Sequence, residues 1–454
     1  MRRLSLVVPL VSLLVAAATV SAPAAPTPAT AFVLAGGGWG HGVGMSQWGA
    51  FGQAKAGRAY KEILGTYFPG TALGAPAGTV PEKVRVLVGD DIASVAVTST
   101  APIVAVDGAG KRYRLGAGVT VDRTLELPVG KEGAAKTVPP PLTLQPTGGA
   151  SLVSGGKTYR GTFEVSRSGT RLQLVNRVSL EAYLLGVVPG EMPKEWPLEA
   201  LKAQAVAART YAVRGLVEGR SFDLYSDWRS QVYYGVGSEA PAATRAVRET
   251  RGQILTYEGK PAQVFYFSSS GGRTLSALDV FGTDVPYLVS VDDPWDEASP
   301  NHRWASQLLS GAQVAKRFGL TGVVADASVV PGTPGKPAVL RLTTAAGGTS
   351  EARLSDVRAR LGLKSTGFRL GVLRLDPPAA RVAGGALVLT GVAKAVEMPV
   401  VEQRAASGAW TTAKRIEPTP TGEFKVRLKI AATTAYRLSA AGLAGPAVTV
   451  RVAP

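Results

Sequence analysis

The chain has 454 residues, which is enough for two or three domains, and it contains no cysteine. The absence of cysteine excludes disulfides, thiolate metal sites and cysteine nucleophiles. Its 50 lysines and arginines against 33 aspartates and glutamates give a formal net charge of +17, which favours an anionic polymer as partner. The basic residues are scattered, without a dense run or interleaved aromatics, so nucleic acid is not the expected polymer.

Residues 1–31 have the pattern of a secretory signal peptide, because Arg2 and Arg3 precede an apolar stretch with a small-residue tail. The best cleavage site is Ala29–Ala31, since an earlier cut would leave proline next to it. An uncleaved N-terminal anchor is the alternative. No later apolar run approaches the ~18 residues of a membrane span. We therefore expect a secreted or cell-wall-associated protein with a mature charge of about +15, which suits anionic wall polymers and peptidoglycan.

Residues 36–50, GGGWGHGVGMSQWGA, form a glycine-rich stretch. It lacks the spacing of a dinucleotide-binding or phosphate-binding loop. Its glycines allow a ligand to approach the backbone, while His41, Ser46 and Gln47 supply polar groups and the tryptophans supply flat faces suited to sugars. A tight turn that packs its tryptophans into the core is the alternative. A helix is expected from about residue 48 to residue 67.

Residues 83–178 predict a region of short β-strands, because alternation and turn glycines recur through them. Residues 130–141 have the composition of an exposed loop. The expected strands are residues 84–88, 94–98, 103–106, 119–127, 142–144, 162–165 and 172–175.

The stretch from 180 to 215 contains two elements. Residues 180–188 are an apolar run that fits either a buried strand or a short helix. Residues 197–214 predict a helix, since Pro197 suits its start and Gly215 suits its end. One face of this helix is apolar and rich in small residues, at Leu198, Leu201, Ala205, Ala208 and Ala212.

Glu191 lies between these two elements, in the loop expected over residues 189–193. Glycine and proline surround it in an apolar setting, where desolvation disfavours an ionised carboxylate and raises its pKa. A carboxyl that is protonated near neutral pH is what a general acid needs. A solvated loop glutamate is the alternative from the local sequence.

Further mixed structure is expected downstream. Residues 230–235 fit a strand and residues 240–251 fit a helix. Residues 262–267 fit a buried strand that ends in the serine–glycine turn 268–272. No G-x-S-x-G motif accompanies these serines, so the turn is expected to line a groove rather than supply a nucleophile. Residues 286–304 are rich in acids and aromatics but lack the spacing of a calcium loop, which favours a solvated acidic loop.

Beyond Asp376 the sequence changes to short alternating strands, most clearly over residues 424–430. The spacing of these strands is typical of an immunoglobulin- or fibronectin-like sandwich, which would serve as a spacer or a wall-binding module. The fold class expected for the whole chain is α+β. The other strands expected in this region are residues 386–390, 398–403, 436–438 and 448–452.

The segment GVVPGEMP, residues 186–193, and the helix after it closely resemble the signature of the SpoIID/LytB family of bacterial cell-wall proteins. The resemblance extends from about Pro81 to Leu370. The segment GHGVGMSQ, residues 40–47, is also similar to a hallmark of the family. In the family's sporulation proteins that hallmark lies near the C-terminal end of the domain, and a circular permutation would explain its place here. Other matching motifs are residues 159–161, 174–176, 231–235, 268–272, 286–288 and 361–368.

The resemblance implies a peptidoglycan lytic transglycosylase, which cleaves between N-acetylmuramic acid and N-acetylglucosamine and leaves 1,6-anhydro ends. Glu191 matches the catalytic acid and would then also act as the base. The alternatives are a non-catalytic amidase enhancer that stimulates a partner hydrolase and a structural wall-binding protein. The residues expected to bind substrate are His41, Ser46, Gln47, Gln204, Arg209, Gln231, Tyr233, Ser269 and Ser270.

Some members of the family bind zinc through cysteine and histidine near the Gln-Val-Tyr motif. Here Arg229 and Ser230 precede Gln231, so we expect no metal and no cofactor. Because the hallmark and the catalytic glutamate belong to one domain in the family, residues 36–50 are expected to fold back beside Glu191. The expected divisions are a signal peptide (1–31), a glycine–histidine segment (32–80) packed on a β-rich SpoIID/LytB-like catalytic domain with a central helix (81–370), and a β-sandwich (371–454).

Overall fold

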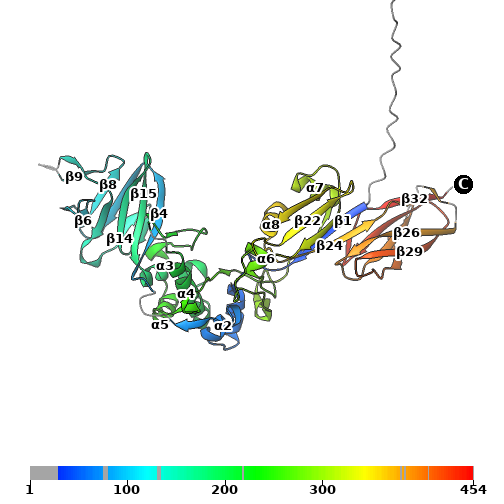
Figure 1. Cartoon of the computed structure of the whole chain (residues 1–454), viewed down its shortest axis with the longest axis horizontal. Coiled ribbons are helices and arrows are strands. Elements are labelled where there is room, and N and C mark those ends of the chain that lie inside the picture. Colours follow the sequence, from blue (N-terminus) through cyan, green and yellow to red (C-terminus); the bar gives the residue numbers. More distant parts are fainter. Residues whose placement is uncertain are drawn as a thin grey trace, which may run out of the picture.

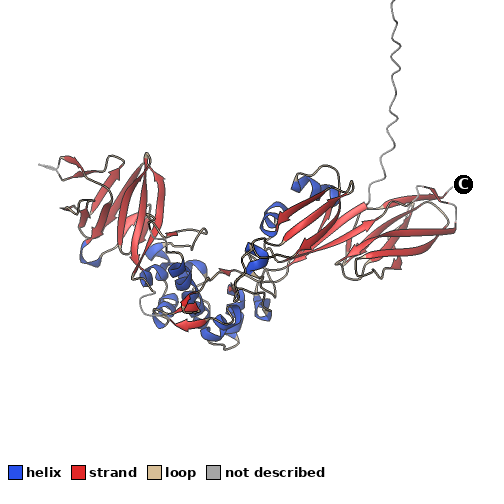
Figure 2. Ribbon diagram, in the orientation of Figure 1, coloured by secondary structure: helices blue, strands red, loops and turns tan. Residues whose placement is uncertain are grey.

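The computed structural model describes residues 29–74, 80–129, 134–216, 219–378, 381–382, 385–406 and 408–452. Their buried apolar residues form three separate hydrophobic cores. Figure 1 shows an elongated molecule, with a β-sheet unit at one end, helices in the middle and two further β-units toward the C-terminus. Figure 2 shows that most of the helices gather in the middle, apart from the sheets, which is an α+β arrangement. Among these residues, no helix is both long and apolar enough to cross a membrane.

The first unit contains a seven-stranded sheet with the order β16-β4-β15-β14-β11-β6-β7, in which only the pair β16–β4 is parallel. A second sheet, β13-β12-β5-β8, packs into the same core. Along β5 and β8 every second side chain is buried, as the period-two pattern predicted. The strands are β4 (Lys83–Ile92), β5 (Ser94–Ser99), β6 (Ile103–Val106), β7 (Arg112–Arg114), β8 (Gly118–Asp122), β11 (Leu142–Pro146), β12 (Leu152–Ser154), β13 (Lys157–Tyr159), β14 (Thr162–Ser168), β15 (Arg171–Ser179) and β16 (Leu224–Tyr225).

Small elements connect these strands. The single strand expected over residues 119–127 is divided between β8 and β9 (Glu126–Pro128), because Leu125 takes a positive φ of 55° at the turn between them. β9 pairs with β10 (Ala135–Thr137), which lies in the segment expected to be a loop. The 3-10 turns of this unit are η2 (Thr147–Gly149), η3 (Gly235–Ser238) and η4 (Pro294–Ala298), which packs on α1.

Helices α1, α2, α3 and α5 of this unit pack around α4, which is buried on nearly all sides. Its many alanines permit this, because they let neighbouring backbones come close without side-chain clashes. Pro197 precedes the helix and Gly215 follows it, as expected. The helices are α1 (Gln47–Lys55), α2 (Tyr60–Tyr67), α3 (Leu180–Glu191), α4 (Leu198–Arg214), α5 (Pro241–Glu249) and α6 (Ala277–Phe281).

The glycine–histidine segment lies along the chain after residue 262. β2 (Met45–Ser46) pairs in parallel with β19 (Tyr266–Phe267). Gly44 has a φ of +79°, and a Cβ atom there would come within 2.2 Å of the Phe265 carbonyl oxygen, so only glycine allows this approach. The neighbouring small strands are β3 (Ala72–Gly74), β17 (Ile254–Tyr257) and β18 (Lys260–Pro261).

Glu191 ends a helix rather than lying in a loop. The apolar run 180–188 is helical, and α3 begins after Ser179, whose hydroxyl accepts a hydrogen bond from the Ala182 amide at 3.3 Å. The helix continues through Pro189 to Glu191. A proline removes one backbone hydrogen bond, and here it does so in the last turn, where the disruption is small.

Three other local predictions are revised. The helix expected over 48–67 is two helices, because the chain turns near Gly57, which has a φ of +84°. Residues 230–235 form no strand, since their amides bond to loop and side-chain oxygens, as Tyr233 does to the Ser226 carbonyl at 3.1 Å. Of residues 262–267 only the last two are in a strand.

The second unit lies on one face of a five-stranded sheet with the order β20-β1-β24-β26-β29. The three-stranded sheet β21-β22-β23 and two helices pack against that face. Its elements are β1 (Ala29–Gly36), β20 (Gln307–Ser310), α7 (Gly311–Phe318), β21 (Val324–Val330), β22 (Val339–Thr344), β23 (Thr349–Arg353), α8 (Leu354–Leu361) and β24 (Phe368–Leu375).

The third unit is a β-sandwich. The same five-stranded sheet packs its other face against a sheet that contains β25, β32, β30, β27 and β28, with β31 paired to β30. In β29 the alternating residues Phe424 and Val426 are buried, as the sequence predicted. The strands are β25 (Arg381–Val382), β26 (Gly385–Lys394), β27 (Val400–Ala405), β28 (Thr411–Arg415), β29 (Glu423–Ile430), β30 (Thr434–Ala440), β31 (Leu443–Ala444) and β32 (Val448–Val452).

Strand β1 joins the second and third units. Phe32 and Leu34 enter one core, whereas Ala31 and Val33 enter the other, because successive side chains of a strand point to opposite faces. Residues of the expected catalytic domain, 81–370, thus contribute to two of the cores, and β1 contributes to the two cores nearer the C-terminus. A signal cleavage after Ala31 would remove the first three residues of this strand. The rest of the expected signal, residues 1–28, lies outside the described residues.

Candidate active site

Glu191 turns its carboxyl group toward the loop 230–235. The Val232 amide donates a hydrogen bond of 2.7 Å to the Oε1 atom of Glu191. Burial raises the pKa of the Glu191 carboxyl above its ordinary value, while hydrogen bonds from Val232 and the Tyr266 hydroxyl lower it in part. The carboxyl is thus held in place and retains its proton to higher pH than a solvated glutamate does, which suits a general acid.

Glu191 lines a cavity of about 340 Å³ whose other walls are mainly aromatic. Trp228 has 85% of its surface exposed and Phe281 has 42%, so both rings present free faces to a ligand. Aromatic faces of this kind suit the apolar faces of sugar rings. Among the described residues that line the cavity, Glu191 carries the only carboxylate. The other lining residues are His41, Tyr211, Trp228, Ser230, Val232, Phe265, Tyr266 and Phe281.

His41 lines the same cavity, and aromatic rings surround its imidazole. The ring centroids of Phe265, Phe267 and Phe281 lie 5.9, 5.5 and 5.8 Å from that of His41. Its Nδ1 atom accepts a hydrogen bond from the Val43 amide at 3.1 Å. Burial lowers the pKa of His41 to about 4, with a further small effect of the Arg358 charge, while a hydrogen bond with the Tyr266 backbone raises it in part. His41 is therefore neutral near pH 7, with its proton on Nε2.

Helix α1 brings Gln47 beneath Glu191. The Nε2 atom of Gln47 donates to the Glu191 backbone oxygen at 2.9 Å and to Gln204 Oε1 at 3.4 Å. The rings of Trp48 and Trp196 pack at 4.8 Å between centroids, which holds α1 against the chain that follows Glu191. The structure thus places residues 36–50 beside Glu191 although more than a hundred residues separate them in sequence.

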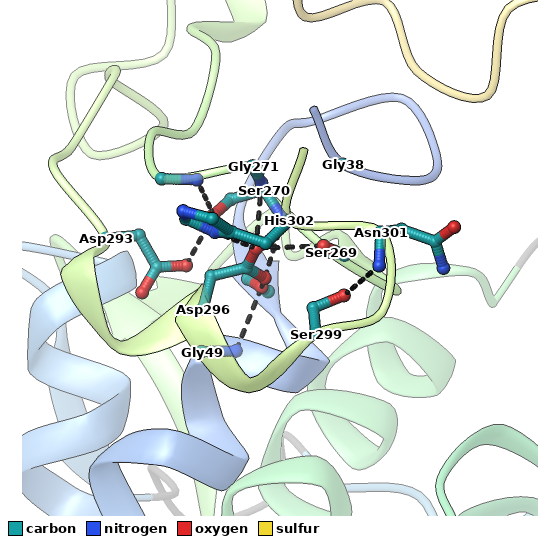
Figure 3. A network of polar contacts seen from close by, with 12 residues as sticks. Gly38, Gly49, Ser269, Ser270, Gly271, Asp293, Asp296, Ser299, Asn301 and His302 are labelled. Carbon is teal, nitrogen blue, oxygen red and sulfur yellow. Dashed lines mark hydrogen bonds and ion pairs between the residues drawn. The ribbon is translucent and has the colours of Figure 1, made fainter. Parts of the chain in front are cut away.

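A network of buried polar groups lies behind this segment (Figure 3). Asp296 is fully buried, and its carboxylate accepts hydrogen bonds from the hydroxyls of Ser46 at 3.0 Å and Ser269 at 2.9 Å. It also accepts from the backbone amides of Ser270 at 3.0 Å and Gly271 at 2.9 Å. These bonds connect the start of α1 to the serine–glycine turn. The network therefore fixes the position of the glycine–histidine segment relative to Glu191.

Asp293 is the second acid of the network. Its carboxylate accepts hydrogen bonds of 2.8 Å from the hydroxyls of Tyr67 and Ser270. Burial raises the pKa of Asp293 to about 6, and these hydrogen bonds oppose the shift. The acidic loop expected over 286–304 is thus only partly solvated. Asp292 is exposed there, whereas Asp293 and Asp296 are buried because serine and tyrosine hydroxyls satisfy their oxygens.

The comparisons with known proteins agree on one family. Residues 168–257, which contain α3, α4 and α5, match the family model described as SpoIID, stage II sporulation protein. Stage II sporulation protein D of Bacillus amyloliquefaciens is 36% identical over 214 residues, covering 43% of this chain and 60% of that protein. The amidase enhancer of Bacillus subtilis (strain 168) is 37% identical over 138 residues, covering 30% of this chain and 18% of that protein. The region around α3, α4 and α5 is therefore similar to the SpoIID family and to the amidase enhancer.

The chain spans about three fifths of the length of the sporulation proteins that it matches. For stage II sporulation protein D of Bacillus subtilis (strain 168) the match covers 62% of that protein and 44% of this chain, with 36% identity over 218 residues. No solved structure matches the chain. The family match includes Glu191 and the loop of Val232, and it leaves out His41 and the residues after 257.

Several residues expected to bind substrate are enclosed instead. Arg209 is fully buried and forms an ion pair with Glu181 at 2.8 Å. Gln231 is fully buried, where its Oε1 atom accepts from the Tyr183 hydroxyl at 3.1 Å. The Tyr233 hydroxyl donates to Asn176 Oδ1 at 2.9 Å. These side chains hold the site together and do not line the cavity, as is also true of Ser46, Gln47, Gln204, Ser269 and Ser270.

The cavity also contains residues that the sequence did not single out. Trp228 is a lone tryptophan in a polar loop, and that isolation is the signal that could have indicated it. Tyr266 and Phe281 gave no such signal, because their neighbours in the cavity are remote in sequence. No cluster of three or more histidine, aspartate or glutamate residues suited to a metal occurs in the part of the chain that the structure describes. A metal-free site stays a prediction.

Proposed function

We propose that the protein is a peptidoglycan lytic transglycosylase in which Glu191 is both general acid and general base. The observation that carries the proposal is a single carboxylate, with a raised pKa, in a cavity with aromatic walls. A glycosidase that hydrolyses its substrate usually needs two carboxyl groups on either side of the bond. A lytic transglycosylase needs one, since the nucleophile belongs to the sugar. The proposal includes secretion to the cell wall, which the pattern of residues 1–31 supports.

The chemistry follows from one carboxyl group in two protonation states. The protonated Glu191 donates its proton to the glycosidic oxygen as the bond from that oxygen to the muramyl C1 atom breaks. The resulting carboxylate accepts the proton of the muramyl C6 hydroxyl, whose oxygen bonds to C1 and closes the anhydro ring. Glu191 ends in its starting state and no water is consumed. The Val232 amide keeps the carboxyl in one orientation through both steps.

Product analysis tests this proposal. Glycan strands incubated with the purified protein should yield 1,6-anhydromuramyl ends, which mass spectrometry separates from hydrolytic ends because a hydrolytic end retains one water more. Reducing ends without the anhydro form would show hydrolysis and contradict the transglycosylase mechanism. Unchanged strands under conditions in which the protein binds glycan would contradict catalysis itself.

A second candidate function rests on the amidase enhancer of Bacillus subtilis, to which 138 residues of this chain are 37% identical. In that case the protein would bind the wall and stimulate a partner hydrolase without cleaving glycan. In such a role the cavity would only bind glycan and would not cleave it. Replacing Glu191 by glutamine would then leave the stimulation of the hydrolase unchanged, whereas it would abolish the release of anhydro ends by a transglycosylase.

A further inference from the structure

A second cavity, of about 390 Å³, adjoins the first. His41 and Phe281 line both cavities, so the two cavities adjoin at these side chains, and together they are called the groove. The far part of the groove comes from the second unit, through the 335–337 loop and the start of α8. The residues that line it are His41, Val280, Phe281, Gly335, Pro337, Arg353, Ser355, Arg358 and Thr366.

Hydrogen bonds fix both walls of this second cavity. The Gly335 amide donates to the Gly282 carbonyl at 2.9 Å, and the Ala338 amide donates to the Asp279 carbonyl at 2.8 Å. These bonds tie the 335–337 loop to the end of α6. On the other wall, the Thr366 hydroxyl donates to the His41 carbonyl at 2.6 Å. The cavity is therefore built by contacts between the first and second units.

The chemistry of this cavity is cationic. Arg353 and Arg358 line it, and no acidic residue does so among the residues described. Neither arginine has an ion-pair partner within the described part of the chain; Arg358 donates only to the Leu363 carbonyl, at 3.4 Å. Burial lowers the pKa of Arg358, which is the cost of holding a guanidinium there without a counter-charge. An anionic ligand would supply that charge.

We propose that this second cavity is a subsite for a carboxylate carried by the glycan, held by Arg353 and Arg358 beside the sugar bound at Glu191. The inference rests on the proposed function for the substrate class. A guanidinium pairs with a carboxylate through two parallel hydrogen bonds, which makes arginine suited to this task. Peptidoglycan carries such groups next to its sugars, either as the free lactyl carboxylate of muramic acid or as the carboxylates of its peptide stems.

Binding measurements on the full chain test the subsite. The chain carries Glu191→Gln so that no ligand is consumed, and titration calorimetry compares three tetrasaccharides. One contains muramic acid with free lactyl carboxylates, one carries peptide stems on amidated lactyl groups, and one contains only N-acetylglucosamine. Arg353→Gln/Arg358→Gln is compared with Arg427→Gln, which removes an exposed arginine from β29 in the sandwich. Arg353→Gln alone is the second variant, because the loss of an exposed side chain should leave the fold intact.

The subsite predicts that one acidic tetrasaccharide binds at least about tenfold more tightly than the neutral one, and that the double variant loses this preference while Arg427→Gln keeps it. The acidic ligand that is preferred identifies the source of the carboxylate. A preference that survives in the double variant, or equal binding of acidic and neutral ligands, overturns the subsite. If the acidic tetrasaccharide is preferred but the unsubstituted protein cleaves no glycan, the proposed catalysis is overturned and the subsite stands. Absence of binding to all three ligands overturns both.

Discussion

Glu191 and Asp296 are both acids held among residues of the first unit, yet their surroundings differ. Asp296 is fully buried and accepts from two serine hydroxyls and two backbone amides, so its oxygens are satisfied within the protein. Glu191 accepts one backbone amide at Oε1 and lines an open cavity with aromatic walls. The first arrangement stabilises a charge and joins distant segments. The second leaves a carboxyl able to exchange its proton with a ligand.

Asp293 shows that a raised pKa alone does not identify a catalytic acid. Its pKa is raised to about 6, and burial is the main cause there as it is for Glu191. The Asp293 carboxylate nevertheless accepts hydrogen bonds from Tyr67 and Ser270 inside the network, and it lines neither part of the groove. Access to a ligand therefore separates Glu191, the carboxyl proposed to act in catalysis, from the buried carboxyls of the network.

The largest effect expected from this comparison is on catalysis. Glu191→Gln keeps the size of the side chain but removes its exchangeable proton, so the rate of glycan cleavage should fall by at least ~10²–10⁴-fold with little change in melting temperature. Release of anhydro ends, measured by mass spectrometry, checks the rate. Glu195 is an exposed glutamate four residues after Glu191, and Glu195→Gln is the matched control, which should cleave glycan normally. A Glu191→Gln protein within tenfold of the unsubstituted rate would refute the assignment.

The next effect concerns stability. Asp296→Ala would leave two serine hydroxyls and two amides without an acceptor in a dry site, so the free energy of unfolding should fall by about 3–5 kcal/mol. Chemical denaturation of the full chain measures this change. Asp292→Ala is the control, because that side chain is 78% exposed, and a change within about 0.5 kcal/mol is expected. Equal stability of the two variants would mean that the network does not hold the segment.

A third effect depends on pH. The pKa of Asp293 is raised to about 6 in the folded protein, so between about pH 4 and 6 the folded state binds more protons than the unfolded state. This carboxyl therefore makes the protein less stable as the pH rises through that window, by up to about 3 kcal/mol. Asp293→Asn should remove this contribution. The unfolding free energies of both proteins are measured from pH 4 to 7, and the difference between them should change by that amount across the range. Parallel curves would contradict the shift.

The smallest effect expected is on binding at the groove. Trp228→Ala should weaken the binding of a glycan oligosaccharide by about tenfold, because an exposed tryptophan face is lost from the cavity. Its melting temperature should stay unchanged, since the ring is 85% exposed. Trp410→Ala removes a half-buried ring of the sandwich, outside both cavities, and as the control it should leave binding at the groove unchanged. Unaltered binding by the Trp228→Ala variant would show that this ring does not take part in glycan binding.

Most of the secondary structure followed from local patterns. Spacing of apolar residues, with Pro197 before the helix and Gly215 after it, predicted α4 because a helix buries one stripe through every third or fourth residue. Alternation predicted β5, β8 and β29 for the corresponding reason. The run 180–188 was left open between strand and helix, since a short apolar run is compatible with both. Contacts with the rest of the helical region decided for the helix.

The sequence by itself determined the motif around Glu191 and the α+β class, because each depends on residues close together in the chain. It did not determine which polar residues face the ligand. Arg209 and Gln231 are enclosed because partners from remote segments satisfy them, and such partners leave no local pattern. The groove was likewise decided only by the tertiary structure. Its walls come from His41, Trp228, Phe281 and Arg358, which the packing of the first and second units brings together.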